Sequence, residues 1–201
     1  MTRRGTLAAA AVLMLGACGE RAATGVAGSG GFKGIDITGA EYANALSLPD
    51  AQGRVRTLAD FKGKVTLVFF GYAQCPDVCP TTMAELAEVK RRLGPDGDRL
   101  LGVFVTVDPE RDTPDMLRAY VGSFDPAFVA LRGTPEQTAQ AAKNFKIFYA
   151  KVPGKTEGSY TIDHTAGAYL FDTQGRVRVF TRYGTGPDAL LHDVKLLLQQ
   201  G

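Results

Sequence analysis

Two apolar runs that alternate with amphipathic segments most constrain how this 201-residue chain can fold. Residues 65–70 and 100–107 are almost wholly β-branched, aliphatic or aromatic, which is typical of strands buried on both faces. Further strands are expected at 128–131, 147–152, 168–171 and 177–180, and helices at 80–93, 114–122, 135–144 and 187–198. Strands that alternate with helices predict an α/β fold with a mixed central sheet, largely parallel at its centre.

Turn-forming residues predict where this sheet is closed. Residues 48–61 place turn chemistry among alternating apolar side chains, which indicates a small N-terminal hairpin. The segment 172–175 separates the last two strands and predicts an antiparallel hairpin. Residues 153–160 are expected to form a polar loop.

The first 18 residues resemble an export signal more than a part of this fold. Arg3 and Arg4 precede an uncharged apolar stretch, and Leu-Gly-Ala-Cys at residues 15–18 resembles a bacterial lipobox. We therefore expect residues 1–17 to be a lipoprotein signal peptide and Cys18 to be lipidated in the mature protein. The alternative is a plain signal peptide with a cysteine there by chance.

The charge balance changes once this signal is removed. The chain has 23 basic and 21 acidic residues, and the signal takes away two arginines, so 21 of each remain. A neutral mature chain gives no reason to expect nucleic-acid binding. Residues 18–40, rich in glycine and small side chains, are expected to be a flexible tether before a domain at 41–201. We thus expect an exported domain, anchored by lipid to a bacterial membrane and facing the periplasm or extracytoplasmic space.

Cys75 and Cys79 are the strongest candidates for chemistry. They lie where a buried strand gives way to a helix, and backbone N–H groups at such a junction favour a thiolate. A spacing of four brings the two side chains together on a helical turn, so they can close a disulfide or hold a soft metal. A purely structural disulfide is the plainer interpretation, but so small a loop gains little from cross-linking.

The chain has two histidines, and their contexts differ. His192 lies in the last predicted helix and is interpreted as structural. His164 precedes the strand at 168–171, and in a thioredoxin-like arrangement that loop lies against the redox helix. Two thiolates and one imidazole would form a soft site suited to copper.

Three motifs in this order resemble a known family: VFFGYAQCPDVCPTT at 68–82, VDPERDTP at 107–114 and DHT at 163–165. Together they resemble the Sco/SenC family, the copper chaperones of cytochrome c oxidase assembly. The resemblance implies a thioredoxin-like fold and implies that Cys75, Cys79 and His164 match the family's copper ligands, for Cu(I) or Cu(II). Gln74 stands where many members have histidine.

Three acidic residues near these motifs are candidates to support the site. Asp108 ends a central strand and could tune the sulfurs or orient His164. The alternative is that Asp108 and the following proline form a turn while Asp112 caps a helix. Asp163 directly precedes His164 and is a second candidate for this supporting role. Asp77 could supply an oxygen ligand or simply face solvent.

Two classes of function follow from these residues. The first is a membrane-tethered metallochaperone, and so no enzyme, that delivers copper to the oxidase subunit carrying the CuA centre. Other periplasmic copper chaperones or thiol reductases would be further partners. The second is a thiol–disulfide oxidoreductase, with Cys75 as nucleophile and Cys79 as resolving thiol, that reduces oxidase-subunit cysteines or senses redox state. Against it, three residues separate the cysteines where a thioredoxin has two, and no proline directly precedes the strand after His164.

Overall fold

A computed structural model describes Met1 and residues 31–200 of the chain. Residues 2–17 of the predicted signal peptide, the predicted lipidation site Cys18 and most of the predicted tether lie outside the described residues. The elements follow one another in this order: β1 (Ile35–Asp36), β2 (Ser47–Pro49), β3 (Val55–Thr57), the 3-10 helix η1 (Leu58–Phe61), β4 (Val65–Gly71), α1 (Val78–Arg92), the 3-10 helix η2 (Gly94–Arg99), β5 (Leu100–Thr106), α2 (Pro114–Gly122), β6 (Val129–Leu131), α3 (Pro135–Asn144), β7 (Tyr149–Pro153), β8 (Tyr160–His164), β9 (Gly167–Phe171), β10 (Val177–Arg182) and α4 (Pro187–Gln199).

The central sheet has six strands in the order β1-β10-β9-β4-β5-β6. Strands β4, β5 and β6 are parallel, whereas β9, β10 and β1 continue the sheet in antiparallel pairings. Every residue of β4 and β5 is buried, which confirms the interpretation of their apolar runs. Their register pairs Gly71 with Thr106, so both strands end at the same edge of the sheet and the loops that follow them are neighbours.

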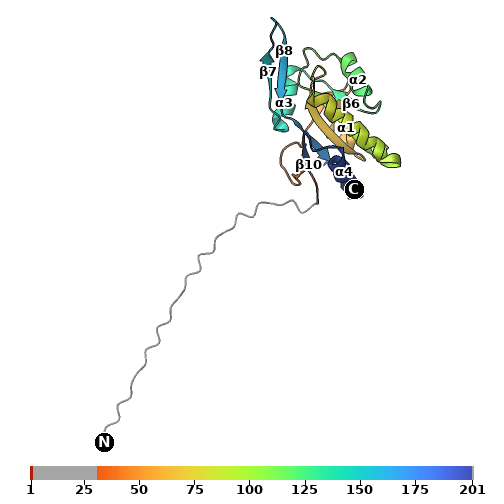
Figure 1. Cartoon of the computed structure of the whole chain (residues 1–201), viewed down its shortest axis with the longest axis vertical. Coiled ribbons are helices and arrows are strands. Elements are labelled where there is room, and N and C mark those ends of the chain that lie inside the picture. The colour runs from red at the N-terminus through yellow and green to blue at the C-terminus, as the bar shows by residue number, and fades with distance from the viewer. Residues whose placement is uncertain (2–30, 201) are drawn as a thin grey trace.

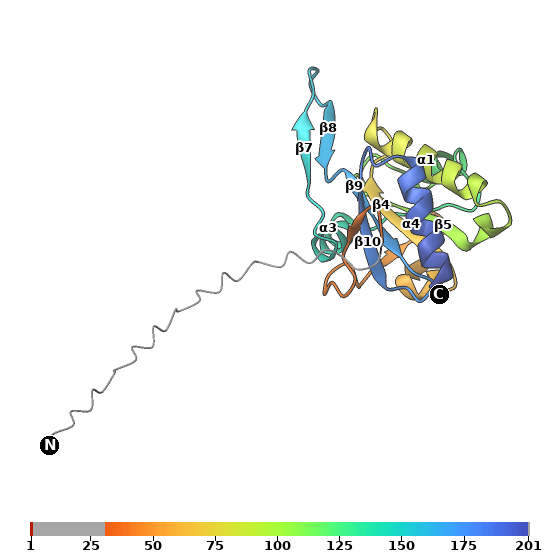
Figure 2. The ribbon, with the colours of Figure 1, turned by 60° about the horizontal axis from the view of Figure 1, so that its bottom comes forward.

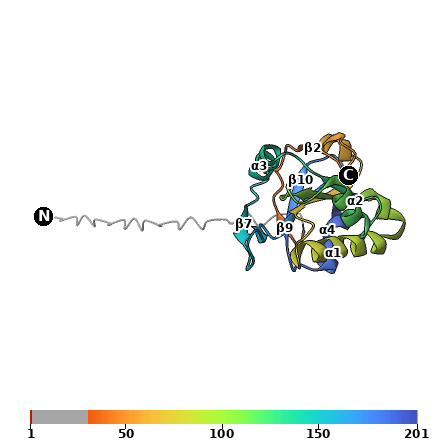
Figure 3. The same ribbon diagram turned by 90° about the horizontal axis from the view of Figure 1, so that it is seen from above.

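Helices cover both faces of this sheet (Figure 3). Helices α1 and α4 lie side by side on one face, while α3 and the β2–β3 hairpin lie on the other. Helix α1 begins at Val78, two residues before the predicted start at Pro80. Proline is tolerated there because the first backbone N–H groups of a helix have no partner within it. No helix in residues 31–200 combines the length and apolar character needed to cross a bilayer.

Strands β7 and β8 form a separate two-stranded hairpin, here called the arm, that extends beyond the six-stranded sheet (Figures 1 and 2). The pairing register joins Tyr149 to His164 and Pro153 to Tyr160. The predicted polar loop at 153–160 therefore forms the tip of a hairpin. Strand β8 has no clear signal in the sequence, because its five residues are too few and too polar on one side to give a strand pattern.

Residues before the expected domain boundary at 41 already belong to the fold. Ile35 pairs with Phe180 at the outer edge of the sheet, and the backbone N–H groups of Lys33 and Gly34 donate to the buried carboxylate of Asp193 at 2.7 and 2.8 Å. Residues 33–36 were thus wrongly included in the tether. Their composition resembles a linker, and the carboxylate that holds them lies about 160 residues away in sequence.

Candidate metal centre

Cys75, Cys79 and His164 lie together at the end of the sheet, close to the edge where β4 stops. One ligand atom from each residue can be chosen so that all three lie within 4.8 Å of one another. Cys75 belongs to the loop after β4, Cys79 to the first turn of α1, and His164 to the last position of β8. This grouping is the only one of its kind among the described residues, and it joins chain segments 85 residues apart.

The two thiols are free and differ in environment. Cys79 is fully buried, while Cys75 is partly exposed and receives the backbone N–H of Cys79 at 3.4 Å. The neighbouring Cys79 thiol has the largest effect on Cys75; together with backbone N–H groups it outweighs partial burial and lowers the pKa of Cys75 to about 4. The nearby Cys75 sulfur and stronger burial raise the pKa of Cys79. At neutral pH the pair therefore holds one outer thiolate and one inner thiol.

The geometry of His164 defines which ring nitrogen faces the sulfurs. Its Nδ1 lies 3.1 Å from the carbonyl oxygen of Thr165, which can only accept, so Nδ1 carries the proton. Nε2 is then left with its lone pair, 3.4 Å from the Cys79 sulfur. The rings of Phe69 and Tyr72 form T-shaped pairs with the imidazole, with centroids 5.8 and 6.1 Å away. The imidazole is therefore prepared as a ligand without any carboxylate partner.

Gly71 makes room for the inner thiol, a role that the sequence motifs do not predict. A Cβ added at this position would lie 2.7 Å from the Cys79 sulfur and 2.9 Å from the Phe69 ring. Only a residue without a side chain allows Cys79 to approach the end of β4 so closely. A glycine that ends an otherwise bulky apolar strand was the available signal.

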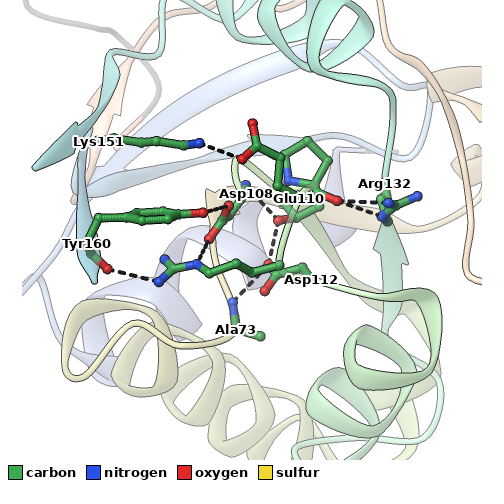
Figure 4. Close-up of polar contacts among 10 residues, drawn as sticks. Ala73, Asp108, Glu110, Asp112, Arg132, Lys151 and Tyr160 are labelled. Atoms are coloured by element: carbon green, nitrogen blue, oxygen red, sulfur yellow. Dashed lines mark hydrogen bonds and ion pairs between the residues drawn. The ribbon is translucent and has the colours of Figure 1, made fainter. Parts of the chain in front are cut away.

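A buried carboxylate anchors the loop that carries Cys75. Oδ2 of Asp112 accepts the backbone N–H of Ala73 at 3.0 Å and the hydroxyl of Thr106 (Figure 4). The suggestion that Asp112 caps a helix is wrong, because Thr113 is the N-cap of α2 and accepts from the backbone of Met116. Asp112 instead ties the loop after β4 to the end of β5.

The three other acidic candidates lie around the site in different ways. Asp108 is buried but receives the Tyr160 hydroxyl and the Arg111 guanidinium, so it does not orient His164 directly. Asp163 is exposed, because alternation along β8 turns it away from the face that carries His164. Asp77 is the exposed N-cap position of α1 and accepts the Tyr183 hydroxyl at 3.1 Å.

His192 lies apart from the metal group, as its structural interpretation required. His192 lies on α4, the helix that also holds Asp193, and its Nε2 is 3.0 Å from the backbone oxygen of Gly31. These two residues connect residues 31–34 to α4.

Fold and site together define a class of protein: a thioredoxin-like domain in which a free cysteine pair and a histidine are placed to hold a soft metal ion. The model of the SCO1/SenC family matches residues 36–199, which is most of the chain. The chain therefore belongs to the SCO1/SenC family.

Solved structures confirm the predicted fold. The chain is 42% identical to copper-bound ScoI of Bradyrhizobium japonicum, with 77% of this chain and 98% of that one covered and a TM-score of 0.69. It is 35% identical to the apo Sco1 protein of Thermus thermophilus, with 83% and 97% covered and a TM-score of 0.74. The thioredoxin-like α/β fold and the family resemblance expected from sequence are both borne out.

Two curated relatives extend the comparison. A SCO2-like protein of Rickettsia felis is 34% identical over 151 residues, which cover 75% of this chain and 74% of that protein. The mitochondrial SCO2 homolog of Mus musculus is 39% identical over 140 residues, but the match spans only 54% of its length.

Proposed function

We propose that this protein binds copper through Cys75, Cys79 and His164 and delivers it to the CuA centre of cytochrome c oxidase, or helps that centre to mature. The observation that carries the proposal is the convergence of two thiols and one imidazole within 4.8 Å. Soft sulfur ligands with an imidazole suit Cu(I), and imidazole also suits Cu(II). The copper-bound state of the Bradyrhizobium japonicum relative supports the same cargo here.

The difference between the two thiols suggests an order of events. Cys75 is the accessible thiolate and would make the first bond to incoming copper. Cys79 must release a proton before it can coordinate, because thiolates and not thiols are metal ligands. His164 would then complete the site from the arm. Delivery would reverse these steps, with ligands of the acceptor replacing those of this protein one at a time.

The proposed place of action rests on the sequence. A lipid on Cys18 and the residues between it and Lys33 would let the domain reach a membrane-embedded oxidase from the periplasmic or extracytoplasmic side. The resemblance of the cysteine and histidine motifs to the copper chaperones of cytochrome c oxidase assembly supports the oxidase as the acceptor. Other periplasmic copper chaperones and thiol reductases remain proposed partners.

A second candidate is a thiol–disulfide oxidoreductase, and the low pKa of Cys75 favours it. A thiolate with a buried neighbouring thiol is the arrangement of a nucleophilic and a resolving cysteine. Such an activity would reduce cysteines of an oxidase subunit or sense redox state. The residue before β9 is Ala166 and not a proline, so the usual guide for substrate peptides is missing.

Copper titration of the reduced protein separates the two functions. Wild type is expected to bind one copper and to show thiolate-to-Cu(II) charge-transfer bands, and Cys75→Ser, Cys79→Ser and His164→Ala should each weaken binding at least about tenfold. His192→Ala is the matched control and should leave binding and spectrum unchanged. Equal affinities of wild type and a Cys75→Ser/Cys79→Ser variant, together with rapid turnover of disulfide substrates, would favour the oxidoreductase.

A further inference from the structure

We propose that Asp108, Arg111 and Tyr160 form a clamp that fixes the arm against the edge of the sheet and thereby positions His164 beside Cys79. The clamp residues are positioning residues, since none of them touches a sulfur or the imidazole. The inference rests on the proposed copper function for its consequence, but the clamp itself is a property of the metal-free protein.

Arg111 is the centre of the clamp and makes three kinds of contact. Its Nε pairs with the carboxylate of Asp108. Its Nη1 donates to the backbone oxygen of Tyr160 at 2.9 Å, and its guanidinium carbon lies 3.7 Å from the centroid of the Tyr160 ring. Stacking and a planar fork of donors are both specific to arginine, so lysine could not reproduce this geometry.

Tyr160 closes the clamp from the side of the arm. Its hydroxyl donates to Asp108 at 2.9 Å. The Asp108 carboxylate therefore has two partners, Tyr160 from the arm and Arg111 from its own loop. Asp108 is 1% exposed, and a buried carboxylate is stable only when such partners are in place. Lys151 on β7 adds an ion pair with Glu110 at 2.7 Å, but both side chains are largely exposed and the pair contributes little.

The direction of the side chains links the clamp to the metal centre. Tyr160, Ile162 and His164 alternate along β8 and are buried or partly buried, while Thr161 and Asp163 between them are exposed. One face of the strand therefore carries the clamp at one end and the candidate ligand at the other. The arm's strands pair only with each other within the described residues, so contacts like these must set its position relative to α1.

Two separate supports therefore hold the candidate ligands. Cys75 and Cys79 are held by β4, α1 and the Asp112 anchor, whereas His164 arrives on the arm. Loosening the clamp should leave the two thiols in place and remove only the imidazole from the group. The expected result is a protein that still binds copper through sulfur but loses the nitrogen ligand.

The first test measures the metal-free protein by NMR. In wild type we expect nuclear Overhauser contacts between the His164 ring and the rings of Phe69 and Tyr72, which flank it. Arg111→Gln should weaken these contacts strongly, while Arg118→Gln, which removes an exposed surface pair, should retain them. Unchanged contacts in a folded Arg111→Gln protein would overturn the clamp, whatever the protein does with copper.

The second test uses copper and a double-variant cycle. Arg111→Gln should lower copper affinity about 10- to 100-fold and reduce the histidine nitrogen splitting in the Cu(II) electron paramagnetic resonance spectrum. Added to His164→Ala, the same change should have no further effect, because the ligand that it positions is already gone. An equal loss in both backgrounds would mean that Arg111 acts through general stability, and the proposal would be wrong.

A milder variant covers the case in which Arg111→Gln fails to fold. Tyr160→Phe keeps the stacked ring and leaves Asp108 paired with Arg111, but it deletes the hydroxyl bond. Copper affinity should fall about two- to tenfold, which is the range expected for one hydrogen bond, and the nitrogen splitting should weaken in parallel. Wild-type affinity and splitting in this variant would overturn the role of Tyr160. Failure of the wild type to bind copper would refute the proposed function and leave the NMR test of the clamp intact.

Discussion

Gly71→Ala should destabilise the domain and disturb the inner thiol at the same time. The added Cβ would lie 2.7 Å from the Cys79 sulfur, 2.9 Å from the Phe69 ring and 3.1 Å from the Phe104 ring. Non-bonded carbon atoms prefer about 3.5–4.0 Å, so all three neighbours must move. All of them are fully buried, and overpacking of this kind costs about 1–3 kcal/mol.

Urea unfolding of the reduced, metal-free protein measures this destabilisation. With three simultaneous clashes we expect the upper half of that range, about 2–3 kcal/mol. At an m value of about 2 kcal/mol per molar urea, the midpoint should fall by about 1–1.5 M. The displaced sulfur should also move away from Nε2 of His164, which now lies at 3.4 Å, so copper affinity should fall as well.

Two further variants make the result specific. Gly122→Ala places a methyl group in open space at the exposed end of α2, and it should leave stability unchanged or raise it by about 0.5–1 kcal/mol. In a Cys79→Ala background the penalty of Gly71→Ala should shrink by about 1 kcal/mol, because the closest clash is gone. Wild-type stability of Gly71→Ala, or the same penalty in both backgrounds, would refute the reasoning.

Two other stability predictions follow from buried carboxylates. Burial alone would raise the pKa of Asp172. Hydrogen bonds to its carboxylate, chiefly from the backbone N–H and guanidinium of Arg176, outweigh burial and lower this pKa overall. Because the pKa of Asp172 is lower in the folded state than in the unfolded one, its ionised carboxylate stabilises the fold. This contribution is fully present above the unfolded pKa, near 3.8, and is lost as pH falls through the folded value. Acid titration of unfolding should show that loss in wild type and a smaller one in Asp172→Asn, and identical acid profiles would count against the assignment. Asp193→Ala should lower the free energy of unfolding, measured by heat or urea, by about 1–3 kcal/mol, because it leaves the N–H groups of Lys33 and Gly34 unpaired. Hydrogen exchange at those two amides should rise selectively. Unchanged exchange there would contradict the prediction.

Local sequence patterns predicted the elements on which the site is built. The apolar runs at β4 and β5 could only be satisfied by strands buried on both faces, and they are. Thr113 and Thr134, each followed by proline, start α2 and α3 as expected. The spacing of Cys75 and Cys79 is likewise local, and one helical turn suffices to bring them together.

The errors at sequence level concern contacts between distant segments. The local pattern predicts a loop where β8 forms, and a tether where residues 33–36 join the fold. Each is stabilised by a partner elsewhere in the chain, which no local periodicity can reveal. The turn expected at Asp108 and Pro109 does form, with the Arg111 N–H donating to the Asp108 carbonyl. Direct orientation of His164 by Asp108 and a helix cap by Asp112 are not found, since the partners of these carboxylates come from the arm and from the loop before α1.

The sequence by itself determined the central strands, most helix boundaries and the cysteine pair, because each depends on residues a few positions apart. Tertiary structure alone decided that the arm carries His164 to within 3.4 Å of Cys79, across 85 residues. It also decided that Gly71 leaves space for the sulfur and that Arg111 joins the arm to the sheet edge. These features follow from strand order and register, which fix distances between segments that local sequence preferences leave free.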